Sequence, residues 1–325
     1  MSLKLTLYIK NKEASNDMAL QIHYTKTHFT LTMLHNTTLS SNKVSALRGG
    51  LGTMLLHSNC ISDKQCDSCF FSDECLVQRI MYSKFDIKPA YITTGESVGY
   101  ILECENHKRN FQKGDLLEFD LILFGKSIIH FSQLLQALFS LGQSGLGANK
   151  AHFSISDIQN ETGKNILCNG NIIMSNYQPH MLQSYVEHRL TEFPYANELS
   201  NVSLIFHSPT TIKYQGNIQP SFHIEAILNS IARRIEMLNY YEGKPISGKE
   251  LIHNIPNVVK QSSYAEEVNR YSSRHKENIK LHGITGDLLL SNVDFETLSL
   301  LLAGELIHIG KNTSFGFGRY TVVPQ

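Results

Sequence analysis

The length, composition and charge of the chain restrict what it can be. Its 325 residues exceed the roughly 100–200 residues of one typical domain and 42% of them are hydrophobic, so we expect two domains with packed cores. The 29 Lys and Arg residues balance 29 Asp and Glu residues, so binding of a polyanion would require a local basic cleft. No apolar run reaches the roughly 18 residues of a membrane span and the first residues alternate as in a strand, so we expect a cytoplasmic protein without a membrane partner.

The first half of the chain combines strand and helix periodicities. The patterns predict a strand within 22–34, a helix at 44–56, a strand at 116–124, a helix at 129–141, a glycine loop at 142–147 and a strand at 151–158. A cysteine-rich insertion at 57–80 follows the first helix.

The second half repeats this order. Its predicted elements are a strand at 202–206, a helix at 224–240, a strand at 279–290, a helix at 295–307, a glycine loop at 310–318 and a strand at 319–323. The repetition predicts an α+β fold of two tandem βαββαβ domains of the ferredoxin-like (RRM-like) type. We place these domains at 1–160 and 200–325, with a polar connecting region at 161–199.

Four cysteines lie within sixteen residues of the insertion: Cys60, Cys66, Cys69 and Cys75. Disulfides are disfavoured in the cytoplasm, whereas four thiolates can close a tetrahedral zinc site that holds a loop together. An Fe–S cluster and cysteines without a metal are the alternatives, and His57 can replace one ligand. A catalytic metal is disfavoured, because four cysteine ligands leave no open coordination position.

The glycine-rich segment at 304–319 carries the most specific pattern in the chain. His308 and Lys311 lie on either side of Gly310, and two further glycines follow at 316 and 318. A nucleotide-binding P-loop is excluded by the spacing, by Asn312 in place of a hydroxyl residue, and by the order of helix before strand. Glycines that lack Cβ can nevertheless bring bare backbone N–H groups against phosphates.

Several segments together resemble one known family. They are the glycine-rich segment, the run Leu47-Arg48-Gly49-Gly50-Leu51-Gly52 with the cysteines after it, residues 119–147 with Leu-Phe-Gly and Gly-x2-Gly-Leu-Gly, and residues 271–286. In this order they resemble the RAMP superfamily of CRISPR-associated RNA-binding proteins, specifically its branch of precursor-crRNA processing endoribonucleases.

The resemblance implies a sequence-specific endoribonuclease that cleaves precursor crRNA within its repeats. The ribose 2′-OH would attack the adjacent phosphodiester, leaving a 2′,3′-cyclic phosphate and a 5′-OH, with no cofactor for catalysis. A non-catalytic RAMP subunit that binds crRNA in a CRISPR effector complex is the alternative. The implied partners are repeat RNA and subunits of such a complex, and we expect a monomer or a homodimer.

Such a reaction needs a base, an acid and cations near the phosphate. His308, Lys311 and His57 are the catalytic candidates. For His308 the alternative is a core histidine that orients the loop, and for His57 it is a zinc ligand or a helix cap. Lys311 is the candidate for stabilising charge on the phosphate.

Further residues are candidates for RNA binding. Three glycines in one short helix cost about 0.5–1 kcal/mol each, so either another element packs closely on that helix or RNA approaches it beside Arg48. Phe315 and Phe317 can stack on bases or pack in the core. The predicted RNA-binding residues are Arg48, Gly310, Gly316, Gly318, Arg319, Arg274, His275 and Lys276.

Overall fold

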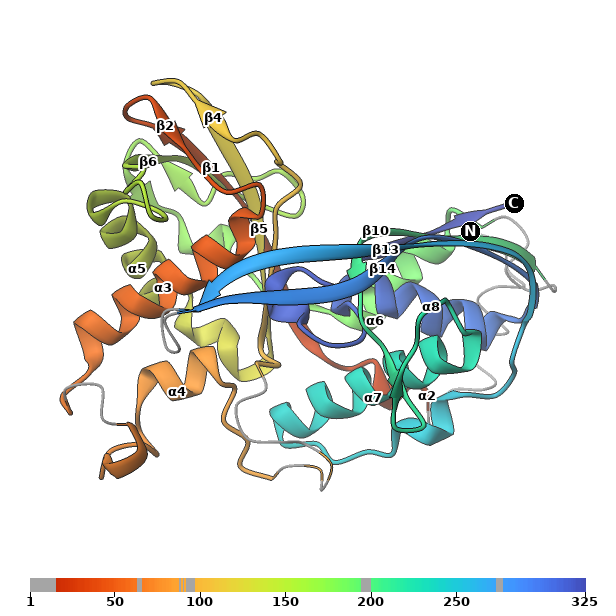
Figure 1. Ribbon diagram of the computed structural model, residues 1–325. Coiled ribbons are helices and arrows are strands. Elements are labelled where there is room, and N and C mark those ends of the chain that lie inside the picture. Colours follow the sequence, from red (N-terminus) through yellow and green to blue (C-terminus); the bar gives the residue numbers. More distant parts are fainter. Residues whose placement is uncertain are drawn as a thin grey trace.

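The first domain is a five-stranded antiparallel sheet, in which four strands form the main path and a short fifth strand pairs with the start of the first, covered on one face by two helices. A computed structural model describes residues 16–62, 66–87, 89, 91, 97–193, 200–272 and 277–325. The domain consists of β1 (His23–Met33), α3 (Lys43–Asn59), β3 (Tyr100–Glu103), β5 (Leu116–Phe124), α5 (Phe131–Ser144) and β6 (Phe153–Asn160). The order β3-β5-β1-β6 is that of a ferredoxin-like βαββαβ unit (Figure 1).

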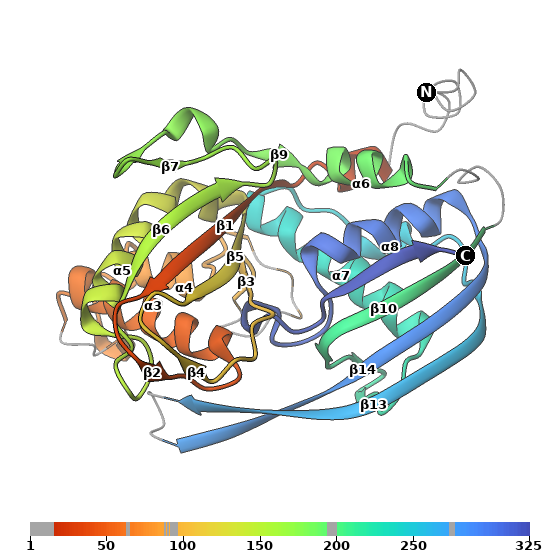
Figure 2. The same cartoon turned by 90° about the horizontal axis from the view of Figure 1, so that it is seen from above.

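The second domain repeats this topology. It consists of β10 (Ser200–Thr210), α7 (Ile224–Glu242), β13 (Asn257–Ser272), β14 (Glu277–Val293), α8 (Phe295–Ile307) and β15 (Tyr320–Pro324). The sheet order is β13-β14-β10-β15, equivalent to the order in the first domain (Figure 2). The predicted α+β class with two tandem ferredoxin-like units is confirmed.

Shorter elements surround the two sheets. They are α2 (Asn16–Ala19), β2 (Thr37–Thr38), α4 (Leu76–Met81), β4 (Asn110–Phe111), β7 (Leu167–Cys168), β8 (Asn171–Ile172), β9 (His180–Met181), α6 (Leu182–Leu190), β11 (Lys213–Tyr214) and β12 (Asn217–Ile218). Among the described residues, no helix is long and apolar enough to cross a membrane.

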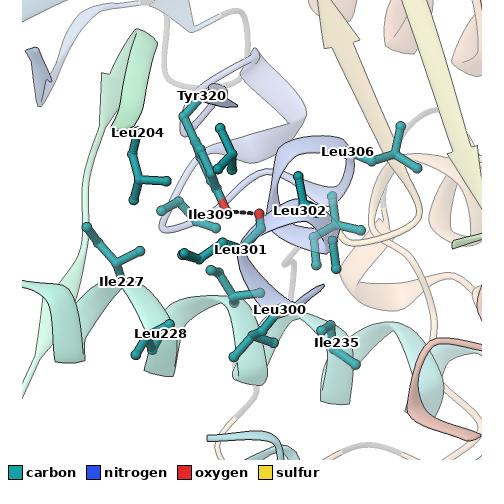
Figure 3. Close-up of a cluster of buried hydrophobic side chains, with 14 of the residues drawn as sticks. Leu204, Ile227, Leu228, Ile235, Leu300, Leu301, Leu302, Leu306, Ile309 and Tyr320 are labelled. Carbon is teal, nitrogen blue, oxygen red and sulfur yellow. Dashed lines mark hydrogen bonds between the residues drawn. The ribbon is translucent and has the colours of Figure 1, made fainter. Parts of the chain in front are cut away.

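One hydrophobic core joins the two domains. Ile101 and Ile122 of the first sheet belong to the same buried cluster as the helices α7 and α8 of the second domain. Figure 3 shows the second-domain part of this cluster, where the Tyr320 hydroxyl donates to the carbonyl oxygen of Leu301 at 2.6 Å (Figure 3). Arg234, which is buried in α7, donates to the Val98 carbonyl oxygen of the first domain at 2.9 Å. The junction between the domains is therefore a packed interface.

Alternation along β1 separates a core face from an open face. Thr25, Thr27 and Phe29 are buried, whereas Lys26 and His28 are only partly buried on the opposite face. The register pairs His28 with Asp120 of β5 and Glu103 of β3 with that same Asp120. Antiparallel pairing thus places four ionisable side chains on one face of the sheet, next to the second domain.

The hairpin of β13 and β14 is much longer than its own domain requires. The two strands have 16 and 17 residues, and the distal part of the hairpin extends to α3 of the first domain (Figures 1 and 2). The hairpin is therefore a second connection between the domains, separate from the shared core.

Candidate functional site

The glycine-rich loop lies at the junction of the two domains. After α8 the chain forms a short 3-10 turn at Thr313–Phe315, which contacts β3 and α3 of the first domain. Gly316 has φ +77°, and a Cβ at this position would stand 2.8 Å from the carbonyl oxygen of Leu102 in β3. Only glycine permits this backbone conformation together with this close approach.

The N–H groups of the loop glycines donate hydrogen bonds within the protein. This corrects the expectation that they are free to bind phosphates. The N–H of Gly310 donates to the Ser230 hydroxyl oxygen at 2.8 Å, and that of Gly318 donates to the Pro209 carbonyl oxygen at 3.0 Å. The N–H of Gly316 donates to a carbonyl oxygen within the loop at 2.8 Å. These three donors are already satisfied, so the glycines shape the loop by close packing and positive φ.

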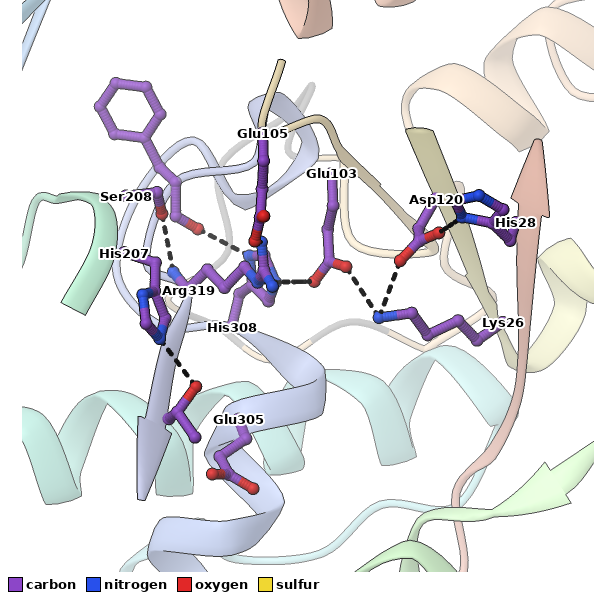
Figure 4. A network of polar contacts seen from close by, with 12 residues as sticks. Lys26, His28, Glu103, Glu105, Asp120, His207, Ser208, Glu305, His308 and Arg319 are labelled. Carbon is purple, nitrogen blue, oxygen red and sulfur yellow. Dashed lines mark hydrogen bonds and ion pairs between the residues drawn. The ribbon is translucent and has the colours of Figure 1, made fainter. Parts of the chain in front are cut away.

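His308 is completely buried, at 0% exposure, where α8 ends. Its Nδ1 lies 2.9 Å from the Phe317 carbonyl oxygen, and its Nε2 lies 2.7 Å from Oε1 of Glu103 (Figure 4). A carbonyl and an ionised carboxylate only accept, so both ring nitrogens donate and neither is left to take a proton from substrate. This geometry supports the alternative role of an orienting core histidine.

The backbone of His308 is also strained. Its φ of 55° and ψ of 163° are rare for a residue with Cβ and cost on the order of 1–3 kcal/mol. The two hydrogen bonds of the ring hold the residue in this conformation, which redirects the chain from α8 into the loop.

Glu103 is the centre of a charged network between the domains (Figure 4). Its carboxylate, in a residue 7% exposed, lies 2.8 Å from Lys26 Nζ and 3.7 Å from Arg319 Nε, besides the bond to His308. Burial alone would raise the pKa of Glu103, but the His308 hydrogen bond and the charges of Lys26, His308 and Arg319 hold that pKa far below its usual range. The carboxyl group is therefore ionised at neutral pH.

The network continues outward from Glu103 on both sides. Lys26 Nζ also contacts Asp120 at 3.1 Å, and Asp120 contacts Nδ1 of His28 at 2.7 Å. Arg319 pairs with Glu105 as well as Glu103, and its backbone N–H donates to the Ser208 hydroxyl oxygen at 2.9 Å. Arg319, predicted to bind RNA, is thus already held by two carboxylates of the first domain.

The structure does not bring the three catalytic candidates together. His57 is exposed in the last turn of α3, and Lys311 is exposed in the loop beside β10, where its N–H donates to the Thr211 carbonyl oxygen at 2.8 Å. His308 is in the core between the domains. His57 and Lys311 are the two of the three whose side chains can reach a ligand in this conformation.

Arg48 of α3 lies beside the glycine-rich loop. Its guanidinium carbon is 4.2 Å from the centroid of the Phe315 ring, and its Nη2 donates to the Ser97 hydroxyl oxygen at 3.1 Å. Arg270 of β13 lies over the same ring, at 4.7 Å. Phe317, in contrast, is a core residue that is 2% exposed.

The helix glycines are explained mainly by packing. A Cβ on Gly50 would stand 2.6 Å from Leu141 of α5, and one on Gly52 would stand 3.3 Å from Met81 of α4. A Cβ on Gly49 would meet no heavy atom within 4 Å. Two of the three glycines therefore allow neighbouring helices to approach α3, and only Gly49 faces open space.

Two predicted features gain no support from the structure: the basic residues at 274–276 and the cysteine cluster. Arg274, His275 and Lys276 lie outside the described residues. The cysteines Cys60, Cys66, Cys69 and Cys75 all line one pocket, but no group of three or more His, Cys, Asp or Glu side chains in the described parts of the chain could hold a metal ion. In this conformation the four cysteines line the pocket without forming such a group.

Sequence reasoning missed Glu103 and Arg270. Glu103 ends the buried strand Tyr100–Glu103, and a carboxylate directly after three apolar residues was a usable sign that a buried cation faces it. Arg270 lies in a strand of mostly exposed residues, where the local sequence offers no such sign.

Comparisons with known proteins agree with this fold and this loop. Residues 204–320 match the family model described as CRISPR-associated endoribonuclease Cas6, and residues 20–184 match the model AF_1859_N, described as an N-terminal domain. The Cas6 match contains the whole glycine-rich loop. No curated protein matches the sequence.

Solved structures share the fold at low sequence identity. A Cas6 product complex is matched with a TM-score of 0.53 and 14% identity over 93% of this chain and 99% of that one. Thermus thermophilus Cas6 is matched with a TM-score of 0.50 and 12% identity, also over 93% of this chain and 99% of that one. A partial Cas6-RT-Cas1–Cas2 complex is matched with a TM-score of 0.55 and 12% identity over 94% of this chain. The match covers only 46% of that longer chain.

At 12–14% identity, the likeness to solved structures shows the fold alone. The family models show in addition which segments of this chain match known families in sequence. The two matched segments cover the first βαββαβ unit and most of the second, including the glycine-rich loop between α8 and β15. Residues 204–320 therefore match the Cas6 family of CRISPR-associated endoribonucleases, and the chain shares its fold with solved Cas6 structures.

Proposed function

We propose that this protein is an endoribonuclease that cleaves precursor crRNA within its repeats and so produces CRISPR guide RNAs. The observation that carries the proposal is the Cas6 family match over residues 204–320, which contain the glycine-rich loop packed against the first domain. The partners are CRISPR repeat RNA and, as in the matched Cas6-RT-Cas1–Cas2 complexes, further CRISPR proteins.

The proposed chemistry is attack of a ribose 2′-OH on its neighbouring phosphodiester without a catalytic metal. In this reaction the 2′-oxygen forms a bond to phosphorus, the bond to the 5′-oxygen breaks, and one proton moves from the 2′-OH to the departing oxygen. The exposed His57 is suited to proton transfer, and the exposed Lys311 to stabilising charge on the phosphate. Buried His308 has the different task of shaping the loop.

The test uses purified protein and a labelled RNA that contains the host's CRISPR repeat, in excess EDTA. We expect cleavage of this RNA and none of a copy with a 2′-deoxy substitution at the cleavage position. His57→Ala and Lys311→Ala are expected to slow cleavage by about 10²-fold or more, as for the loss of a general acid–base group or an electrostatic stabiliser. His188→Ala, which removes another exposed histidine in the last turn of a helix, is the matched control.

A non-catalytic subunit that binds crRNA is the alternative, favoured by the fact that the three predicted catalytic residues lie apart. Tight binding of the repeat RNA with no cleavage under any of these conditions would establish that alternative and refute the nuclease. Cleavage that continues on the 2′-deoxy RNA would refute the 2′-OH mechanism alone.

The structural zinc ion remains a prediction from the cysteine spacing. Elemental analysis of protein purified without chelators should find about one zinc per chain, and a Cys66→Ser, Cys69→Ser double variant should lose it. Cys104→Ser, which changes a cysteine outside the insertion, is the control. Equal zinc contents in all three proteins would contradict the prediction.

A further inference from the structure

Three segments that are distant in sequence meet at the Phe315 ring. Arg48 comes from α3 of the first domain, Phe315 from the glycine-rich loop, and Arg270 from the long hairpin of the second domain. The two guanidinium carbons lie 4.2 Å and 4.7 Å from the ring centroid, and all three residues are half-buried. We call Arg48 and Arg270 the arginine pair.

The arginine pair has no carboxylate partner among the described residues. Other partly buried arginines in the described part of the chain differ in this respect. Arg189 pairs with Glu305, and Arg319 pairs with Glu103 and Glu105. Nε of Arg48 and Nε of Arg270 are both buried without an acceptor. Burial and the charge of Arg48 lower the pKa of Arg270, which reflects two cations that are close to each other and poorly solvated.

Such an arrangement is unfavourable unless an anion completes it. A buried charged donor without a partner costs free energy, and two like charges at one ring add repulsion. Contact with the aromatic ring holds both guanidinium groups at one place, and a guanidinium group is suited to bidentate hydrogen bonds with a phosphate. The missing component therefore has the chemistry of an oxyanion such as a phosphodiester.

We propose that the arginine pair is a phosphate-binding site for the repeat RNA, with one arginine contributed by each domain. The inference rests on the proposed function, since RNA is the polyanion that a Cas6 protein meets. It adds Arg270, a residue of β13, to the RNA-binding residues predicted from the sequence. Binding of RNA here also neutralises the repulsion between the two domains' arginines and so stabilises the contact of the hairpin with α3.

The alternative is that the two arginines only pack the hairpin against α3. Both roles predict some loss of stability on substitution, so stability does not separate them. The salt dependence of RNA binding does, because each phosphate contact adds about 0.7–0.9 to the slope of log K against log salt concentration.

The experiment measures binding of the 2′-deoxy repeat RNA, which separates binding from cleavage, over a series of salt concentrations. Wild-type protein is compared with Arg270→Gln, Arg48→Gln and Arg270→Lys, and with Lys260→Gln as the control. Lys260 is an exposed residue of the same strand, so its substitution removes the same charge away from the ring. Circular dichroism establishes that each variant is folded.

We expect Arg270→Gln and Arg48→Gln each to weaken binding about tenfold and to reduce the slope by nearly one, while Lys260→Gln leaves both unchanged. Arg270→Lys retains the charge and should keep the wild-type slope, even if Arg270→Gln proves unstable. Folded Arg270→Gln and Arg48→Gln proteins with the wild-type slope and affinity would overturn the inference, as would loss of slope in Arg270→Lys equal to that in Arg270→Gln. Wild-type protein that binds with this salt dependence but never cleaves repeat RNA would refute the nuclease and leave the phosphate site in place.

Discussion

Replacing Gly318 by alanine is expected to destabilise the protein by about 3 kcal/mol, because two costs coincide at this position. The residue has φ +75°, which costs a residue with Cβ roughly 1–2 kcal/mol. The added Cβ would also overlap the carbonyl oxygen of Ile309, a backbone atom that cannot rotate away. Ile309 in turn donates its N–H to the Gly318 carbonyl oxygen at 3.1 Å, so a shift that relieves the overlap breaks this bond.

Urea denaturation followed by circular dichroism measures this change. Gly163→Ala is the matched control, since Gly163 has φ +77° but open space where its Cβ would lie. The control should lose only the conformational cost of roughly 1–2 kcal/mol. Equal losses in the two variants would show that the loop can open around Gly318 and that the close approach to Ile309 is not a constraint.

The helices and central strands could be predicted because their apolar residues are regularly spaced. The pattern placed the second-domain helix at 224–240, and α7 runs from Ile224 to Glu242, where Gly243 in the left-handed region ends it. Strand β13 was not predicted. Its residues are mostly exposed, because the hairpin projects beyond its domain, so no alternation appears and its pairing with β14 defines it.

The glycine-rich loop could be located from the sequence, but its role could not. A glycine has the same signature whether a ligand or a backbone carbonyl approaches it, and here Leu102 and Pro209 are the neighbours. His308 could likewise be read as catalytic, because its partner Glu103 is 205 residues away in sequence. Long-range pairs of this kind follow from the way in which the two domains pack, which no local pattern contains.

The substitution Glu103→Gln is expected to be the most damaging change in the charged network, at about 3–5 kcal/mol near pH 7. It keeps the shape of the side chain but removes the negative charge that faces His308, Lys26 and Arg319. Removing one partner of a buried ion pair leaves the others uncompensated, and Glu103 is 7% exposed while His308 is 0% exposed. Glu118→Gln, the same change at an exposed position of β5, should alter the free energy of unfolding by less than about 0.5 kcal/mol.

The pH dependence of the stability difference between wild type and Glu103→Gln shows whether the charge or the shape of the Glu103 side chain causes it. The pKa of Glu103 in the folded protein is below its ordinary value of 4.5, so its ionisation stabilises the fold fully above pH 4.5 and progressively less as the pH falls toward the folded-state pKa. The difference in the free energy of unfolding between wild type and Glu103→Gln should therefore narrow steadily as the pH falls from 4.5 to 3, whereas wild type and Glu118→Gln should keep a nearly constant difference. A gap between wild type and Glu103→Gln that persists unchanged down to pH 3 would mean that the shape of the side chain, and not its charge, holds His308 and the loop in place.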